Sequence, residues 1–261
     1  MIKQRHLIVR SRNTSCKPLK EIVVSRPTIL RLGSITPTEK ITKCKNPIEI
    51  NTAKACRLSG NKLLMKRRFK HGKIHTAEYF TIEHLYSTRA YYYLDKWGKI
   101  IIKHKYSSKG NGIYLITSFE ELNAWFNNIN NPVEDYVFER YYNYTREYRL
   151  HITKEGCFYA CRKMLKKDAE IRWHRHDSNS VWILQENPLF DKPSNWEDIV
   201  QDCVNALKSL GLDLAAFDVK VQSSKKENPK FIILESNSAP SLGEKTLQEY
   251  KKKLKWIILD F

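Results

Sequence analysis

Short apolar runs, many with alternating polar and apolar positions, recur along the chain and are typical of β-strands. Strands are predicted at 21–25, 28–33, 99–105, 112–116, 135–141, 147–153 and 157–165. Lys154-Glu155-Gly156 between the last two predicts a β-hairpin. Two more apolar strands follow near the C-terminus, at 214–221 and 231–237, and we expect them to pair antiparallel.

Three amphipathic stretches predict helices. Ser59 is the expected N-cap of a helix over 61–70, with Leu63, Leu64 and Phe69 facing inward and Gly72 ending it. A capping box at 118–121 predicts a second helix that reaches about residue 129.

A further capping box, Ser194 to Glu197, predicts a third helix that ends at Gly211. Its expected buried residues are Ile199, Val200, Cys203, Leu207 and Leu210. Strands followed by a helix, then by an antiparallel sheet with one inserted helix, indicate an α+β fold rather than an alternating parallel one.

Composition indicates a globular protein large enough for one multi-lobed domain or two small ones. The chain has 261 residues, of which 41% are hydrophobic and 28% charged. It has no apolar run near the roughly 18 residues that cross a membrane and no apolar signal segment at its start, so we expect a cytoplasmic protein with no membrane contact. The six cysteines form no Cys-x-x-Cys pair, which favours reduced core thiols over a metal site.

The net charge of +18 is concentrated in the N-terminal third. Residues 1–75 contain 19 lysines and arginines against three glutamates, or +16, whereas the rest of the chain contains 27 against 25, or +2. Such a field attracts polyanions, among which nucleic acid is the commonest. An ordinary solvated lysine-rich surface is the alternative.

Three oxygen-bearing side chains interrupt the two C-terminal apolar strands. Glu235 and Asn237 alternate on one face, and antiparallel pairing brings Asp218 to the same face. Because a buried carboxylate pair needs a counter-ion, this set predicts a Mg²⁺ site, and Mg²⁺ held in this way points to ATP. Salt-bridged residues on an exposed sheet face are the alternative.

A polar loop between the strands at 99–105 and 112–116 is a candidate phosphate flap. Its glycines, Gly110 and Gly112, allow close approach of an anion, while Ser107, Ser108 and Lys109 supply donors. Lys103 in the preceding strand could add an ammonium group to the same phosphates. Taken alone, a loop of this composition is more often a hairpin turn.

The order of these pieces resembles the ATP-grasp superfamily, which includes D-alanine:D-alanine ligase and glutathione synthetase. The resemblance covers about residues 58–243. Its pieces are Asn61-Lys62, Lys103 with the polar loop, the segment around Glu139, Glu147-Tyr148-Arg149-Leu150, Asp218, and Glu235 with Asn237. It implies two α+β lobes with the nucleotide between them, preceded by a short basic N-terminal region at 1–57.

The first lobe implied by the resemblance covers 58–134 and contacts the ATP phosphates. Lys62 resembles its phosphate-binding lysine, with Lys66 as the alternate. Lys103 resembles the second ATP lysine, although His104 follows it where many relatives have proline.

The second lobe implied by the resemblance covers 135–261. The segment around Glu139 resembles the hinge that reads adenine, with Glu139 or Glu147 contacting the adenine amine or a ribose hydroxyl. Arg149, together with Arg162 or Lys163, matches the cations that face the transferred phosphate.

The implied reaction is ATP-dependent ligation of a carboxylate to an amine through an acyl phosphate, releasing ADP. The charge of the N-terminal third adds the hypothesis of an acceptor that is polyanionic or carried on nucleic acid. A kinase on the same scaffold and a non-catalytic nucleic-acid-binding module are the alternatives.

Two other polar segments are weaker candidates. The loop after Arg31 could bind an anion or serve only as a turn. His174, His176, Asp177 and Asn179 fit a solvent-exposed loop better than a metal site.

Overall fold

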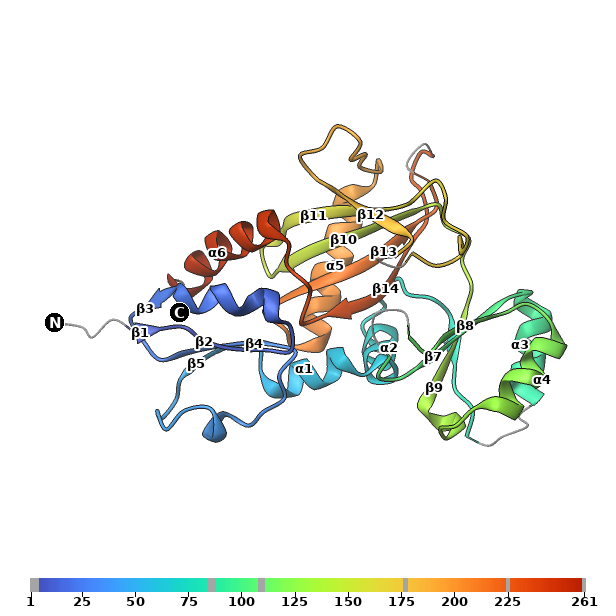
Figure 1. Ribbon diagram of the computed structural model, residues 1–261, viewed down its shortest axis with the longest axis horizontal. Coiled ribbons are helices and arrows are strands. Elements are labelled where there is room, and N and C mark those ends of the chain that lie inside the picture. Colours follow the sequence, from blue (N-terminus) through green and yellow to red (C-terminus); the bar gives the residue numbers. More distant parts are fainter. Residues whose placement is uncertain (1–4, 84–87, 108–110, 176–177, 224–225, 260–261) are drawn as a thin grey trace.

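The computed structural model describes residues 5–83, 88–107, 111–175, 178–223 and 226–259, and its helices and strands form an α+β arrangement (Figure 1). Four sheets occur in these ranges. The sheets of four and five strands lie on either side of helix α2 (Lys62–His71), and a three-stranded parallel sheet is formed by the N-terminal part of the chain.

The N-terminal unit is built around three parallel strands in the order β2-β4-β5. A two-stranded antiparallel ribbon, β1 with β3, adjoins it. The elements are β1 (Arg5–His6), β2 (Ile8–Ser11), a 3-10 helix (Thr14–Glu21), β3 (Val23–Val24), β4 (Thr28–Leu32), a 3-10 helix (Thr38–Lys40) and β5 (Ile48–Ile50). The strand predicted at 28–33 is thus confirmed, while that at 21–25 shrinks to two residues because the 3-10 helix extends through Glu21.

The middle of the chain forms an antiparallel sheet in the order β6-β9-β7-β8, with helices α3 and α4 on one face (Figure 1). Its elements are α1 (Ala53–Gly60), α2 (Lys62–His71), β6 (Tyr79–Phe80), α3 (Thr88–Trp97), β7 (Ile100–His104), β8 (Ile113–Ile116), α4 (Phe119–Asn128) and β9 (Tyr136–Arg140). Strand β9 pairs with β7 and β6 although it follows residue 134, the expected end of the first lobe. The division at 57/58 and 134/135 stays a prediction.

The C-terminal sheet is antiparallel, in the order β12-β11-β10-β13-β14. Its elements are β10 (Arg146–Thr153), β11 (Gly156–Leu165), β12 (Ser180–Leu184), α5 (Trp196–Leu210), β13 (Leu214–Val221), β14 (Phe231–Asn237) and α6 (Glu244–Leu259). The β10–β11 hairpin and the antiparallel β13–β14 pair are both confirmed.

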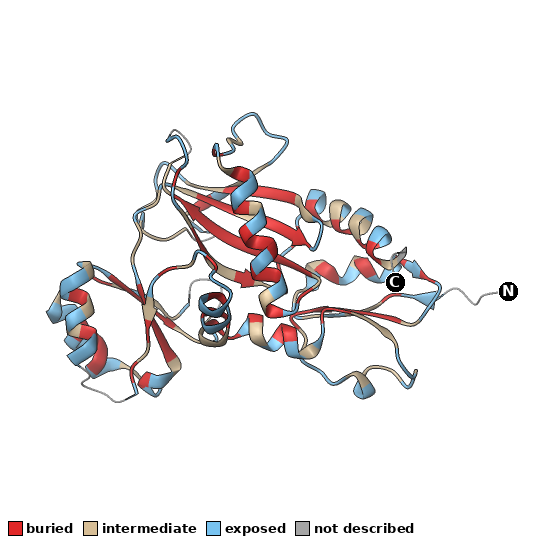
Figure 2. Ribbon diagram, turned by 180° about the vertical axis from the view of Figure 1, so that it is seen from behind, coloured by how far each residue is buried: buried red, intermediate tan, exposed pale blue. Residues whose placement is uncertain are grey.

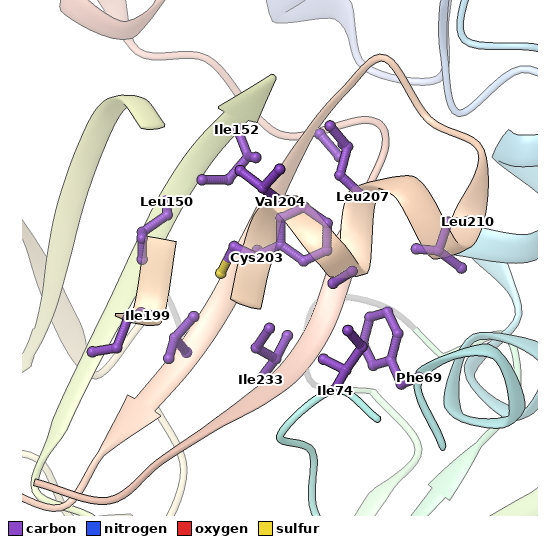
Figure 3. Packing of buried hydrophobic residues seen from close by; sticks show 14 of the residues in the cluster. Phe69, Ile74, Leu150, Ile152, Ile199, Cys203, Val204, Leu207, Leu210 and Ile233 are labelled. Atoms are coloured by element: carbon purple, nitrogen blue, oxygen red, sulfur yellow. The ribbon is translucent and has the colours of Figure 1, made fainter. Parts of the chain in front are cut away.

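Helix α5 covers one face of this sheet and forms the largest core (Figures 2 and 3). Its Ile199, Cys203 and Leu207 pack toward Leu150 of β10 and Ile233 of β14, as Figure 3 shows. Val200, predicted to be buried, is half-buried against this core, whereas Leu210 is buried. Because α5 occupies one face, the polar side chains of the strands are left on the other.

Helix caps differ from two of the predictions. Asn61, not Ser59, caps α2 by accepting a hydrogen bond from Leu64 N, because Ser59 instead pairs with Ser236. Asn195 is the N-cap residue of α5, and the Ser194 hydroxyl accepts from Asn228 N, so the predicted capping box is wrong.

Two other helix ends follow the predictions. Ser118 caps α4 by accepting from Glu121 N at 3.2 Å. Gly211 ends α5 with φ +68°, a left-handed conformation that favours glycine. The start of α4 and the end of α5 therefore lie where the sequence placed them.

Candidate active site

The two C-terminal carboxylates lie directly opposite each other on neighbouring strands. Asp218 of β13 is the register partner of Glu235 of β14, and Asn237 pairs with Ala216 two positions along the same face. Phe217 and Val219 alternate with Asp218 and lie in the α5 core, so the three oxygen-bearing side chains occupy the face away from α5. The structure thus brings the predicted metal-ligand set together.

Arg149 of β10 makes a bidentate ion pair with Asp218. Its Nε and Nη2 lie 2.7 and 2.8 Å from the two carboxylate oxygens, and its guanidinium stacks 4.7 Å from the ring centre of Trp182. Burial raises the pKa of the Asp218 carboxyl, but the charge of Arg149 and its hydrogen bonds outweigh burial and hold that pKa below its ordinary value. Asp218 therefore carries its negative charge in the folded protein.

Lys163 and Arg162 lie on opposite faces of β11. Arg162 pairs in register with core-facing Tyr148 and binds Asp191 and the carbonyl of Leu189, away from the carboxylates. Lys163 lies one position along, on the face of Arg149, with its ammonium 5.0 Å from the Trp182 ring centre. The structure therefore brings Lys163, and not Arg162, to the candidate site.

Helix α2 directs two lysines one turn apart toward the sheets. Lys62 and Lys66 are buried, whereas Leu63 and Leu64, the predicted inward residues, are only half-buried. Lys62 lies 3.6 Å from a Glu235 oxygen and donates to the carbonyl of Ser107. Lys62 therefore joins the metal-ligand strand to the polar loop.

Glu139 of β9 is a buried carboxylate that contacts two lysines. Its Oε2 lies 2.9 Å from Lys103 Nζ and 3.4 Å from Lys66 Nζ. Burial raises the pKa of Glu139, but the two ammonium groups outweigh it and lower that pKa. Burial also lowers the pKa of Lys66 to about 8.

A second buried carboxylate, Glu147 of β10, lies near cations that the sequence prediction did not include. Arg175 lies 3.4 Å from a Glu147 oxygen, and burial raises the pKa of this carboxyl. Lys220 of β13 lies 5.3 Å above the Tyr141 ring, and burial lowers its pKa to about 8. Lys220 could have been predicted as a site residue, because it lies two residues from Asp218 on the same strand and so shares its face. Arg175 could not, because it comes from a loop without periodicity.

The described part of the polar loop adjoins Lys62. Among the described residues, the buried Ser107 hydroxyl has no hydrogen-bond partner, and Gly112 has φ +67°, which favours glycine. Ser108, Lys109 and Gly110 lie outside the described residues.

The two weaker candidate segments do not join this cluster. Arg31 is fully buried and is occupied by Glu49, Thr38 and the carbonyl of Thr36, so it is not available to an external anion. Asn179 donates to the carbonyl of His174, while His176 and Asp177 lie outside the described residues. Within the described ranges, no group of three or more His, Cys, Asp or Glu side chains that could hold a metal ion occurs, and the residue that accompanies Asp218 and Glu235 is an amide, Asn237.

A cavity of about 920 Å³ opens at the connection between the two larger sheets. Its walls include Tyr141, Tyr142 and Tyr144 from the segment after β9, His75 before β6, and Ile232 of β14. It lies at the Val221 end of β13 and the Phe231 end of β14. None of the described helices is both long enough and apolar enough to span a bilayer.

Comparison with known proteins gives matches at the level of structure. Neither a scan against protein-family models nor a search of curated proteins gives a match. Among solved structures, D-alanine–D-alanine ligase from Bacillus anthracis matches with a TM-score of 0.63 at 15% identity, over 94% of this chain and 80% of that chain.

Two further solved structures are similar. The N5-carboxyaminoimidazole synthetase from Staphylococcus aureus, in complex with ADP, has a TM-score of 0.66 at 14% identity, over 97% of this chain and 70% of that chain. The ATP-grasp ligase PsnB, complexed with a phosphomimetic variant of a minimal precursor, Mg and ADP, is also similar. Its TM-score is 0.56 at 12% identity, over 82% of this chain and 62% of that chain. The chain has the ATP-grasp fold.

Proposed function

We propose that this protein is an ATP-dependent carboxylate–amine ligase that forms an amide bond through an acyl phosphate. The observation that carries the proposal is the Asp218–Glu235 pair of the C-terminal sheet, which faces Lys62 of α2. Carboxylates and lysines on opposite sides of one site fit a magnesium nucleotide, because the carboxylates offset the charge of the metal ion and the lysines offset the charge of the phosphates. Similarity to ligases of the same fold supports the assignment.

The donor set fits Mg²⁺. Asp218, Glu235 and Asn237 would hold it, since they offer hard oxygen ligands on one face and Glu235 is partly exposed. When bound, Mg²⁺ would offset the charge of the phosphates. Two protein carboxylates leave room in an octahedral shell for water and phosphate oxygens, which is usual for magnesium with ATP.

The side chains of the chain divide the remaining roles. Lys62 and Lys103 bind the phosphates, and the buried Glu139 Oε1, which has no hydrogen-bond partner in the described residues, accepts from the amine of the base. Glu147 contacts the ribose. Ser107 and Gly112, at the two ends of the polar loop, contact the phosphates.

In the reaction, a carboxylate oxygen attacks the terminal phosphorus, ADP leaves, and an acyl phosphate forms. An amine then attacks its carbonyl carbon, and inorganic phosphate leaves as the amide forms. Arg149 and Lys163 stabilise the oxyanion of that second step, because both cations lie on the carboxylate face beside Trp182.

Product analysis tests this function. The protein is incubated with Mg·ATP, a panel of ¹⁸O-labelled carboxylates, and hydroxylamine as a small amine that traps acyl phosphates. We expect carboxylate-dependent ADP, a hydroxamate, and one ¹⁸O atom in the released phosphate. Formation of a phosphorylated hydroxyl product without free phosphate would instead show that the protein is a kinase. If the protein bound no ATP at all, the remaining alternative would be a non-catalytic nucleic-acid-binding module.

We further propose that the acceptor is polyanionic, on the evidence of an exposed basic face. This basic face consists of Lys54 and Arg57 on α1, Arg67, Arg68 and Lys70 on α2, and Lys73 just after it. Lys66 is not part of it, because its side chain is fully buried. A surface of one sign attracts a polyanion and makes its binding depend on salt.

Neutralising part of the basic face tests this proposal. In the Arg67→Gln, Arg68→Gln, Lys70→Gln variant, binding of single-stranded RNA or of polyglutamate should weaken. For RNA, the slope of the logarithm of the binding constant against the logarithm of the salt concentration should fall by about one unit for each lost phosphate contact.

The matched control is Lys245→Gln, Lys252→Gln, Lys255→Gln on α6, which removes the same charge from other exposed positions. ATP affinity should change little in either variant. Salt slopes that are equal in the wild type and the α2 variant would contradict a polyanionic acceptor.

A further inference from the structure

One buried carboxylate contacts two lysines, although a single ammonium group would neutralise it. The Glu139 side chain is 2% exposed, and its Oε2 lies 2.9 Å from Lys103 and 3.4 Å from Lys66. These lysines come from different elements, Lys66 from α2 and Lys103 from β7. The surplus positive charge requires an explanation, because burying an ammonium group is unfavourable.

The two lysines differ in where they are held. Lys66 is fully buried and donates to Thr76 Oγ1 at 2.7 Å. Thr76 in turn donates its hydroxyl proton to the carbonyl of Ile233 at 2.8 Å, so its oxygen lone pairs are left to accept from Lys66. Lys66 is therefore fixed at Glu139 by a partner of defined orientation.

Lys103 faces the candidate site. Its side chain is 11% exposed, whereas that of Lys66 is 0% exposed. Burial lowers the pKa of Lys103, but Glu139, Glu235 and Glu147 together outweigh burial and raise it, which places Lys103 in the field of the site carboxylates. Lys103 is thus the member of the pair that can turn toward a ligand.

We propose that Lys66 is a positioning residue that keeps Glu139 neutralised, so that Lys103 is free to leave Glu139 and bind the nucleotide phosphates. The inference rests on the proposed function and extends it to a residue that does not touch the nucleotide. Without Lys66, transfer of Lys103 to the phosphates would leave a buried carboxylate without a counter-ion, which is strongly unfavourable. The alternative is that Lys66 itself contacts the phosphates.

A double-mutant cycle with Glu139→Gln separates these two roles. Mg·ATP affinity of the full chain is measured by calorimetry for the wild type, Lys66→Met, Glu139→Gln and the double variant. We expect Lys66→Met alone to weaken affinity by about ten- to a hundredfold, the usual range for a hydrogen bond to a charged group. In the Glu139→Gln background, where no buried charge needs a partner, Lys66→Met should change affinity by less than about threefold.

Additional variants keep the cycle interpretable. Lys66→Gln keeps a donor but removes the charge, so it should weaken affinity as much as Lys66→Met if the charge is what matters. Lys208→Met on the exposed face of α5 is the matched control and should leave affinity unchanged. Thermal melts verify that every variant is folded.

Each outcome decides the matter. Equal affinity of wild type and Lys66→Met would overturn the positioning role while leaving the ligase proposal in place. An equal loss in both backgrounds would also overturn it, because Lys66 would then contact the phosphates directly. A folded wild type without Mg·ATP binding would overturn the proposed function and this inference together.

Discussion

Replacing Asp218 with Asn and Glu235 with Gln in one chain is expected to reduce ATP turnover by at least about a thousandfold, because the proposed Mg²⁺ site loses both of its charged ligands while the shape of each side chain is kept. The effect should be large because these carboxylates pair directly across β13 and β14, and amide oxygens cannot replace their charge. Turnover is measured as carboxylate-dependent ADP release over a range of Mg²⁺ concentrations.

The matched control replaces two carboxylates on the opposite lobe. Glu120→Gln with Glu134→Gln removes the same charge from exposed positions and should leave turnover unchanged. Circular dichroism and a melt establish that the site variant is folded, since Arg149 loses its charged partner in it. Full ADP release by the folded site variant would refute the metal assignment.

Replacing Arg149 with Met is expected to destabilise the ligand-free protein by about 3–5 kcal/mol, the usual consequence of removing one member of a buried ion pair. Asp218 would keep its burial but lose the guanidinium that now binds both of its oxygens. Denaturant unfolding measures the loss. Adding Mg²⁺ should raise the midpoint of the variant more than that of the wild type, because the cation takes over neutralisation of Asp218.

The double variant Arg149→Met, Asp218→Asn is the control for this assignment. It has no buried uncompensated carboxylate at this position, so it should recover most of the lost stability and respond less to Mg²⁺. A single variant as stable as the wild type would show that the bidentate pair is not what neutralises Asp218. Equal responses to Mg²⁺ in all variants would argue against a metal at this position.

The carboxylate strands could be predicted from the sequence because strand geometry alone decides them. A period of two places Glu235 and Asn237 on one face, and a short connection makes β13 and β14 antiparallel. The same rule did not separate Arg162 from Lys163. The segment 161–164 (Cys-Arg-Lys-Met) has no clear alternation of polar and apolar residues. Which of the two cations faces the site therefore depends on the register of β11 with β10, in which Arg162 is paired with Tyr148.

The inward face of α2 was predicted only in part, because Phe69 is buried as expected but Leu63 and Leu64 are half-buried. Hydrophobic periodicity does not select Lys62 and Lys66, yet both are buried because Glu235 and Glu139 lie opposite them on distant strands. Partners so far apart in sequence leave no local signal. The N-cap of α2 was predicted wrongly for a similar reason: Asn61 caps the helix, and the distant partner Ser236 pairs with Ser59 instead.

The core of the N-terminal unit has a consequence for the order in which the chain folds. Leu7, Leu30 and Ile50 share one core with Tyr250 and Leu254 of α6, more than 190 residues later in the chain. During synthesis, therefore, the first strands emerge long before the helix that buries them. Contacts of such separation slow folding, so the parallel sheet is expected to be completed last, after the sheet that carries Asp218 and Glu235.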